Sequence, residues 1–141
     1  MPFKFLEGIA TVDLAFEAQA LSEEKLFEEA AQALTSAMAD PATIKQKRKT
    51  EISLQAANIE DLLYDFLSEI VAIKDADGLL FSKYQVKLTK NGGYKLQAAC
   101  HGEEINPDTQ ELKDDVKAVT KHKFSLEKVG DKFKVQGVLD V

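Results

Sequence analysis

Two segments with helical periodicity, set among stretches whose apolar residues alternate, place the strongest constraint on the fold of this chain. The first begins after Ser22, a good N-cap, and we expect it to end near Asp40 because Pro41 disfavours a continuing helix. The second begins after Asn58, which caps it, and should stop before Asp77-Gly78. Any fold for this chain must therefore pack two amphipathic helices.

The other segments alternate apolar and polar residues, which is the period of half-buried β-strands. Strands are predicted over residues 10–18, 44–55, 83–88, 94–100, 116–127 and 133–141. Asn91-Gly92-Gly93 is a strong hairpin signal, and a last hairpin should turn at Val129-Gly130-Asp131. We expect one α+β domain over residues 1–141, with two helices packed on a single, mostly antiparallel sheet.

Composition narrows the function classes. The formal net charge is −6, whereas a constitutive nucleic-acid binder needs a surplus of Lys and Arg to neutralise phosphates. The basic run Lys45–Lys49 is the local exception. Such a run is most often a solvated face, although it could dock RNA or an acidic partner.

Location is suggested by what the chain lacks. No apolar run approaches the ~20 residues of a membrane span, and the first residues lack the apolar core of a signal peptide. A single cysteine, Cys100, cannot form an internal disulfide. We therefore expect a cytoplasmic protein without membrane contact. Its oligomeric state stays open, because exposed strand edges could pair.

The last residues suggest a cation site. Asp140 lies on the polar face of the final predicted strand, and Asp13 lies on the polar face of the first. If those strands are neighbours, Asp13, Asp140 and the main-chain carboxylate of Val141 can converge, and a divalent cation would offset their mutual repulsion. All-oxygen ligation favours Ca²⁺, Mg²⁺ or Mn²⁺ over zinc. The alternative is that both aspartates are simply solvated.

The residues most often used in catalysis give little support for an enzyme. His101 and His122, the only histidines, lie in predicted strands with no Ser or Cys nucleophile motif nearby. Cys100 falls on the apolar face of its strand and is expected in the core. A small enzyme that uses His122 with Asp140 remains an alternative, but the sequence contains no recognisable substrate cradle.

Five stretches, in order, resemble the archease family of small proteins that assist RtcB-class RNA ligases in tRNA splicing. They are residues 10–17 with Asp13, the helix at 22–34, the segment from Asn58 through Ser82, residues 116–122, and the terminal 138–141. The resemblance covers the chain from about Phe5 to Val141. It implies a divalent metal, commonly calcium, held by the strand aspartate and the last two residues, which here are Asp13, Asp140 and Val141.

The same resemblance implies a function. The family promotes guanylylation and multiple turnover of the ligase, is said to broaden the nucleotide that the ligase accepts, and does not form the phosphodiester bond itself. It implies an RtcB-class ligase as the partner, with tRNA reached only indirectly. The alternative is a chaperone or modulator of other DNA- or RNA-processing proteins that has no metal role.

This chain departs from the family pattern at two positions. Ala10 stands where a histidine usually opens the first motif, and Gln110 stands where the family often has another histidine. Neither change removes an expected metal ligand. Both bear on roles in which those histidines would contact the ligase or move protons.

Overall fold

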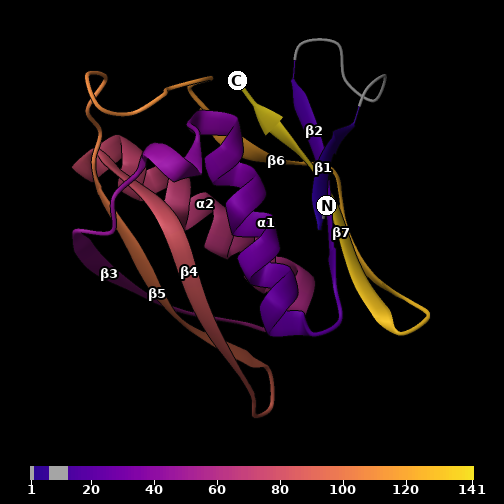
Figure 1. Cartoon of the computed structure of the whole chain (residues 1–141). Helices are drawn as coiled ribbons and strands as arrows, with labels where there is room; N and C mark the ends of the chain where they lie inside the picture. The colour runs from indigo at the N-terminus through magenta and orange to yellow at the C-terminus, as the bar shows by residue number, and fades with distance from the viewer. Residues whose placement is uncertain (1, 7–12) are drawn as a thin grey trace.

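The structure is a computed structural model, which describes residues 2–6 and 13–141 (Figure 1). In order, the elements are β1 (Phe3–Leu6), β2 (Leu14–Ala20), α1 (Glu23–Met38), the 3₁₀ turn η1 (Pro41–Thr43), β3 (Arg48–Ala56), α2 (Ile59–Asp77), β4 (Leu79–Lys90), β5 (Tyr94–Glu104), β6 (Ala118–Val129) and β7 (Lys132–Asp140). The α+β class is confirmed. No helix of the described residues is long and apolar enough to cross a membrane.

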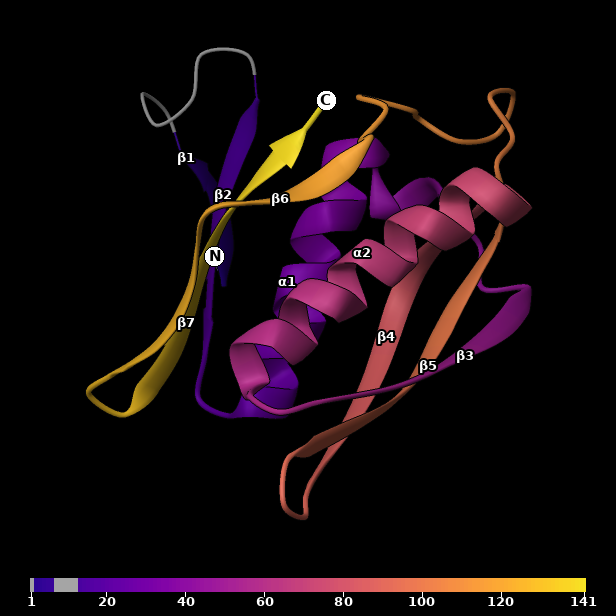
Figure 2. The same ribbon diagram turned by 180° about the vertical axis from the view of Figure 1, so that it is seen from behind.

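The strands form two sheets, where the sequence led us to expect one. One sheet has the order β1-β2-β7-β6 and the other β3-β5-β4, with all pairs antiparallel. Helix α1 packs on β2 and β4, and α2 packs on β6 and β3, so the helices join the sheets (Figures 1 and 2). Alternation predicts the two faces of a strand but not its neighbours, and this is why the division was missed.

Both helices begin and end close to the predicted residues. The Ser22 hydroxyl accepts a hydrogen bond from the Lys25 N–H, and the Asn58 side chain accepts one from the Asp61 N–H. Helix α2 ends at Gly78, which has a φ of 64°, the left-handed conformation that glycine adopts without strain. The capping signals were therefore sufficient to place both helices.

Strand boundaries differ more from expectation. The first predicted strand, 10–18, is observed as β2, which runs to Ala20; residues 10–12 lie outside the described part of the chain. Strand β3 begins at Arg48 instead of residue 44, because η1 precedes it and buries Ile44. The short strand β1 was not predicted.

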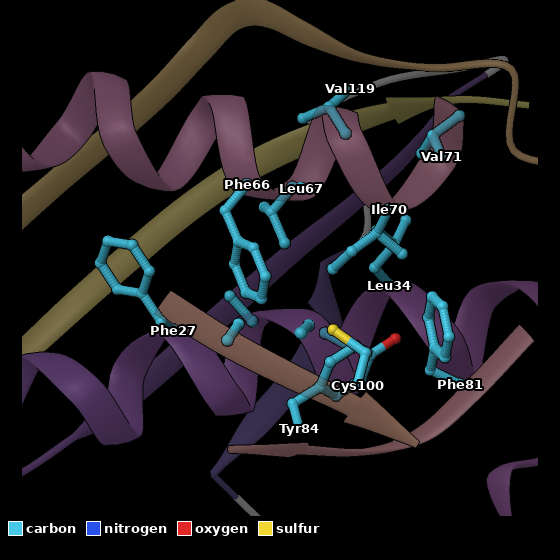
Figure 3. Close-up of a cluster of buried hydrophobic side chains, with 14 of the residues drawn as sticks. Phe27, Leu34, Phe66, Leu67, Ile70, Val71, Phe81, Tyr84, Cys100 and Val119 are labelled. Carbon is cyan, nitrogen blue, oxygen red and sulfur yellow. The ribbon is translucent and has the colours of Figure 1, made fainter. Parts of the chain in front are cut away.

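One core lies between the two sheets. Phe27 of α1 and Phe66 of α2 stack with ring centroids 6.1 Å apart, and Tyr84 of β4 meets Phe66 edge-on (Figure 3). Cys100 is fully buried beside them, as predicted. Because each helix contributes to the same cluster, neither sheet is expected to be stable without the helices.

Helix carboxylates cover the outer edges of two strands. Glu28 and Glu24 of α1 accept hydrogen bonds from the backbone N–H groups of Val86 and Leu88 in β4, each at 2.8 Å. Glu60 of α2 accepts one from Leu126 of β6 in the same way. These side chains occupy edge donors that could otherwise pair with a second chain.

Candidate metal centre

The candidate site lies where β2 begins and β7 ends. Leu14, the first residue of β2, pairs with Leu139 in antiparallel register. One step further along the same register, Asp13 lies opposite Asp140. Side chains directly opposite each other in an antiparallel pair project from the same face of the sheet, so the register brings these two carboxylates together.

Both aspartates lie on the outer face of the four-stranded sheet. Leu14 is partly buried and Leu139 fully buried, and both belong to the core, so the neighbouring Asp13 and Asp140 project to the opposite face. Each of the two aspartates is partly exposed. The faces predicted for the last strand, with Leu139 inward and Asp140 outward, therefore agree with the structure.

The chain end is held from both sides. Asp140 pairs with Ala118 of β6, and its carbonyl oxygen accepts a hydrogen bond of 2.7 Å from the backbone N–H of Lys117. Val141 is partly buried and packs against the core. Its main-chain carboxylate is therefore attached to an ordered residue next to Asp140, and not to a mobile tail.

Charge distinguishes this end of the sheet from the next polar position on the same face. Glu17 lies beside Lys4 and Lys134, at 3.6 and 3.7 Å. Within residues 2–6 and 13–141, no lysine or arginine forms an ion pair with Asp13 or Asp140. The carboxylates at the candidate site thus lack the neutralising partners that Glu17 has.

The donor set fits a hard cation. Carboxylate oxygens are the donors that Ca²⁺, Mg²⁺ and Mn²⁺ prefer. Across the described residues, no three side chains of His, Cys, Asp or Glu gather as a metal site would require. That result suits a site with only two such side chains, Asp13 and Asp140, whose third donor would be the main-chain carboxylate of Val141.

A buried hydroxyl lies in the next row of the same face. Thr120 of β6 pairs with Val138, two residues before Asp140. Its Oγ1 is buried and has no hydrogen-bonding partner among the residues that the structure describes. Sequence reasoning did not single out Thr120, although it lies in the stretch 116–122 that resembles the family.

The remaining candidates are dispersed. His101 lies on the three-stranded sheet and contacts Gln85 at 3.1 Å, whereas His122 is exposed in the irregular part of β6. Asp140 pairs with Ala118, four residues before His122, so the register does not align the proposed His122–Asp140 pair. Burial raises the pKa of the Cys100 thiol to about 12, which leaves it protonated and unreactive.

The two family positions that differ here have separate outcomes. Ala10 lies outside the described residues. Gln110 is buried, and its amide donates hydrogen bonds to the Glu103 carboxylate and the Glu104 carbonyl, while its oxygen accepts one from the Asn106 N–H. The hydrogen bonds from Gln110 and from the Lys45 N–H lower the pKa of Glu103, together with nearby lysines. Gln110 therefore fixes the loop that follows β5.

Comparison with known proteins identifies the family. The model of the archease protein family (MTH1598/TM1083) matches residues 3–141. The chain belongs to the archease family. Protein archease of Pyrococcus abyssi is 36% identical over 122 residues, 86% of each chain, and that of Methanopyrus kandleri is 34% identical over the full length of both.

Solved structures agree with the archease fold. The solution structure of Methanobacterium thermoautotrophicum protein 1598 superposes with a TM-score of 0.87 at 33% identity and covers 99% of both chains. The crystal structure of a Thermotoga maritima archease, described as a possible chaperone, gives 0.64 at 22% identity and covers 94% of this chain and 93% of its own. The second likeness concerns the fold alone.

Proposed function

We propose that this archease is an accessory protein of an RtcB-class RNA ligase, and that it promotes guanylylation and multiple turnover of that ligase during tRNA splicing. The observation that carries the proposal is the β2–β7 register, which sets Asp13 opposite Asp140 beside the main-chain carboxylate of Val141. Membership of the archease family supports it, as does the lack of a nucleophile motif. The ligase, and not this chain, would form the phosphodiester bond.

In this proposal, Asp13, Asp140 and the Val141 carboxylate hold a divalent cation, with Ca²⁺ the first expectation. A cation there would supply electrostatic stabilisation of negative charge on a phosphate group. The chain's own contribution is rigidity. Pairing with β2 on one side and the Lys117 N–H on the other hold Asp140 in one position. The resulting acidic tip would dock near the nucleotide site of the ligase and favour its guanylylation-competent state.

Calorimetry with Ca²⁺ and with Mn²⁺ tests the site. Wild type should bind either ion, whereas Asp13→Asn and a variant with one glycine added after Val141 should bind at least 10-fold more weakly. Asp131→Asn, at the exposed turn of the last hairpin, removes the same charge elsewhere and should bind like wild type. If all four proteins bind equally, the site is misplaced.

The chaperone or modulator function is the second candidate, because the Thermotoga maritima relative carries that description. It would act through a surface without a metal. Affinity capture from lysate separates the two, using wild type and Asp13→Asn as baits. Enrichment of an RNA ligase that Asp13→Asn loses supports the first function. A broad set of clients that both baits retain supports the second.

A further inference from the structure

The outer face of the three-stranded sheet collects lysines from all three strands. Lys49 of β3 and Lys83 of β4 flank His101 of β5 in the register, Lys87 of β4 lies beside Gln97, and Lys95 is on β5 itself. All four lysines are exposed. Both helices lie on the other side of this sheet, so no helix covers this face (Figures 1 and 2).

The charge of this face opposes that of the chain. Its four lysines share the surface with one acidic residue, Glu51, whereas the whole chain carries a formal charge of −6. Glu51 lies 3.4 Å from Lys49. In the described part of the chain, Lys83, Lys87 and Lys95 have no carboxylate within 4.0 Å. Three cations on one face are therefore available to a negatively charged ligand.

The same face is hollowed along its length. A depression of about 230 Å³ surrounds Ala99, whose small side chain leaves space between Gln85 and Gln97. A second of about 460 Å³ shares Ser53 and Gln97 with the first. A third of about 520 Å³ shares Gln55 and Lys95 with the second and reaches Tyr94 at the hairpin. Because neighbouring hollows share lining residues, they form one trough.

We propose that this trough binds a single strand of RNA through its sugar-phosphate backbone. Lysines neutralise phosphates, and glutamine, serine and threonine side chains can donate to and accept from ribose 2′-hydroxyls and base edges. Lys83 and Lys87 are four residues apart on β4, about 13 Å, which matches contacts with successive phosphates of an extended chain better than with one compact anion.

The lining also separates RNA from an acidic peptide. Protein partners are bound mainly by buried aromatic, apolar or arginine anchors in well-packed pockets. The trough offers Gln55, Gln85, Gln97 and Ser53, and its aromatic ring, Tyr94, lies only at the hairpin end. A polar, lysine-rich trough with one aromatic ring at its end suits a polynucleotide strand.

This inference goes beyond the proposed function, in which the chain reaches tRNA only through the ligase. The trough is on β3-β5-β4, whereas the candidate metal centre is on the other sheet. The two claims can therefore be tested separately, with purified protein and no ligase. Failure of one leaves the other standing.

Fluorescence anisotropy with a labelled 20-nucleotide single-stranded RNA, from 50 to 200 mM salt, tests the proposal. The test variant is Lys83→Gln/Lys87→Gln/Lys95→Gln. The control is Lys113→Gln/Lys128→Gln/Lys132→Gln, which makes the same charge change at exposed lysines outside the trough. Circular dichroism melting checks that both variants fold like wild type.

Wild type and the control should bind the RNA within twofold of each other, and the trough variant at least 10-fold more weakly. Loss of three phosphate contacts should also reduce the slope of log K against log salt by about 2. No binding by wild type at 50 mM salt overturns the proposal. So does equal weakening of both variants, or displacement of the RNA by polyglutamate as effectively as by unlabelled RNA.

Discussion

Lys74 links helix α2 to the segment that holds the chain end. Its ammonium lies 2.6 Å from Asp115 Oδ1, 2.7 Å from the Val116 carbonyl and 2.8 Å from Asp75 Oδ1, and the residue is only 7% exposed. The next residue, Lys117, donates its N–H to Asp140. Replacing Lys74 should therefore loosen the start of β6 and, through it, the candidate metal centre.

The cost of Lys74→Met follows from these contacts. Methionine keeps most of the aliphatic volume, and the carboxylates of Asp75 and Asp115, 57% and 78% exposed, return to water at little cost. The Val116 carbonyl loses its charged donor, which costs about 1.5–3 kcal/mol. For a chain of 141 residues, each kcal/mol shifts Tm by about 3–4 °C. Thermal unfolding at pH 7 should show a Tm lower by about 5–10 °C.

The pH dependence gives a second readout. Hydrogen bonding to Lys74 lowers the pKa of Asp115 below 3.8, so this contribution is present above that value and is lost as the pH falls through the folded-state pKa. Burial alone would lower the pKa of Lys74, but its bonds to Asp115 and Asp75 raise it above 10.5; its contribution is complete below 10.5 and is lost as the pH rises further. The Tm difference should be constant between about pH 5 and 10. A Tm within 1 °C of wild type at pH 7 would refute this reasoning.

Three further changes test the fold around the core. Gly102→Ala drives a Cβ into the backbone of β4 and should cost about 3 kcal/mol, whereas Gly130→Ala, at a φ of 64° with open space around it, should cost about 1; equal losses in denaturant titrations would contradict the packing. Tyr84→Phe removes the buried hydrogen bond to the Thr35 hydroxyl and should cost about 1 kcal/mol by the same titrations; no loss would place that bond elsewhere. Cys100 should react with a thiol reagent at pH 8 only after unfolding, and stoichiometric labelling of the native protein would show that the thiol is accessible.

Local signals in the sequence predicted the local structure well. Ser22 and Asn58 begin the two helices because a side chain that caps the first turn acts within three residues of itself. Alternation placed Asp140 on the face opposite Leu139, and the last hairpin turns at Gly130 as expected. These features depend on neighbours in the chain, which a sequence displays directly.

Features that depend on strand pairing could not be predicted in the same way. The approach of Asp13 to Asp140 needed the assumption that their strands are neighbours, and only the register supplies it. The basic run was the expected charged surface, yet Lys47 and Arg48 lie beside Glu103 and Glu104. The lysines of the trough come from three different strands, so no single stretch of sequence reveals them.

Guanylylation of a purified RtcB-class ligase, with this protein at substoichiometric and equal amounts, tests the central claim most directly. Wild type and Asp131→Asn should each allow one molecule of archease to support guanylylation of many ligase molecules. Asp140→Asn should abolish that stimulation while folding normally. No stimulation by wild type, or equal stimulation by Asp140→Asn, would contradict the account.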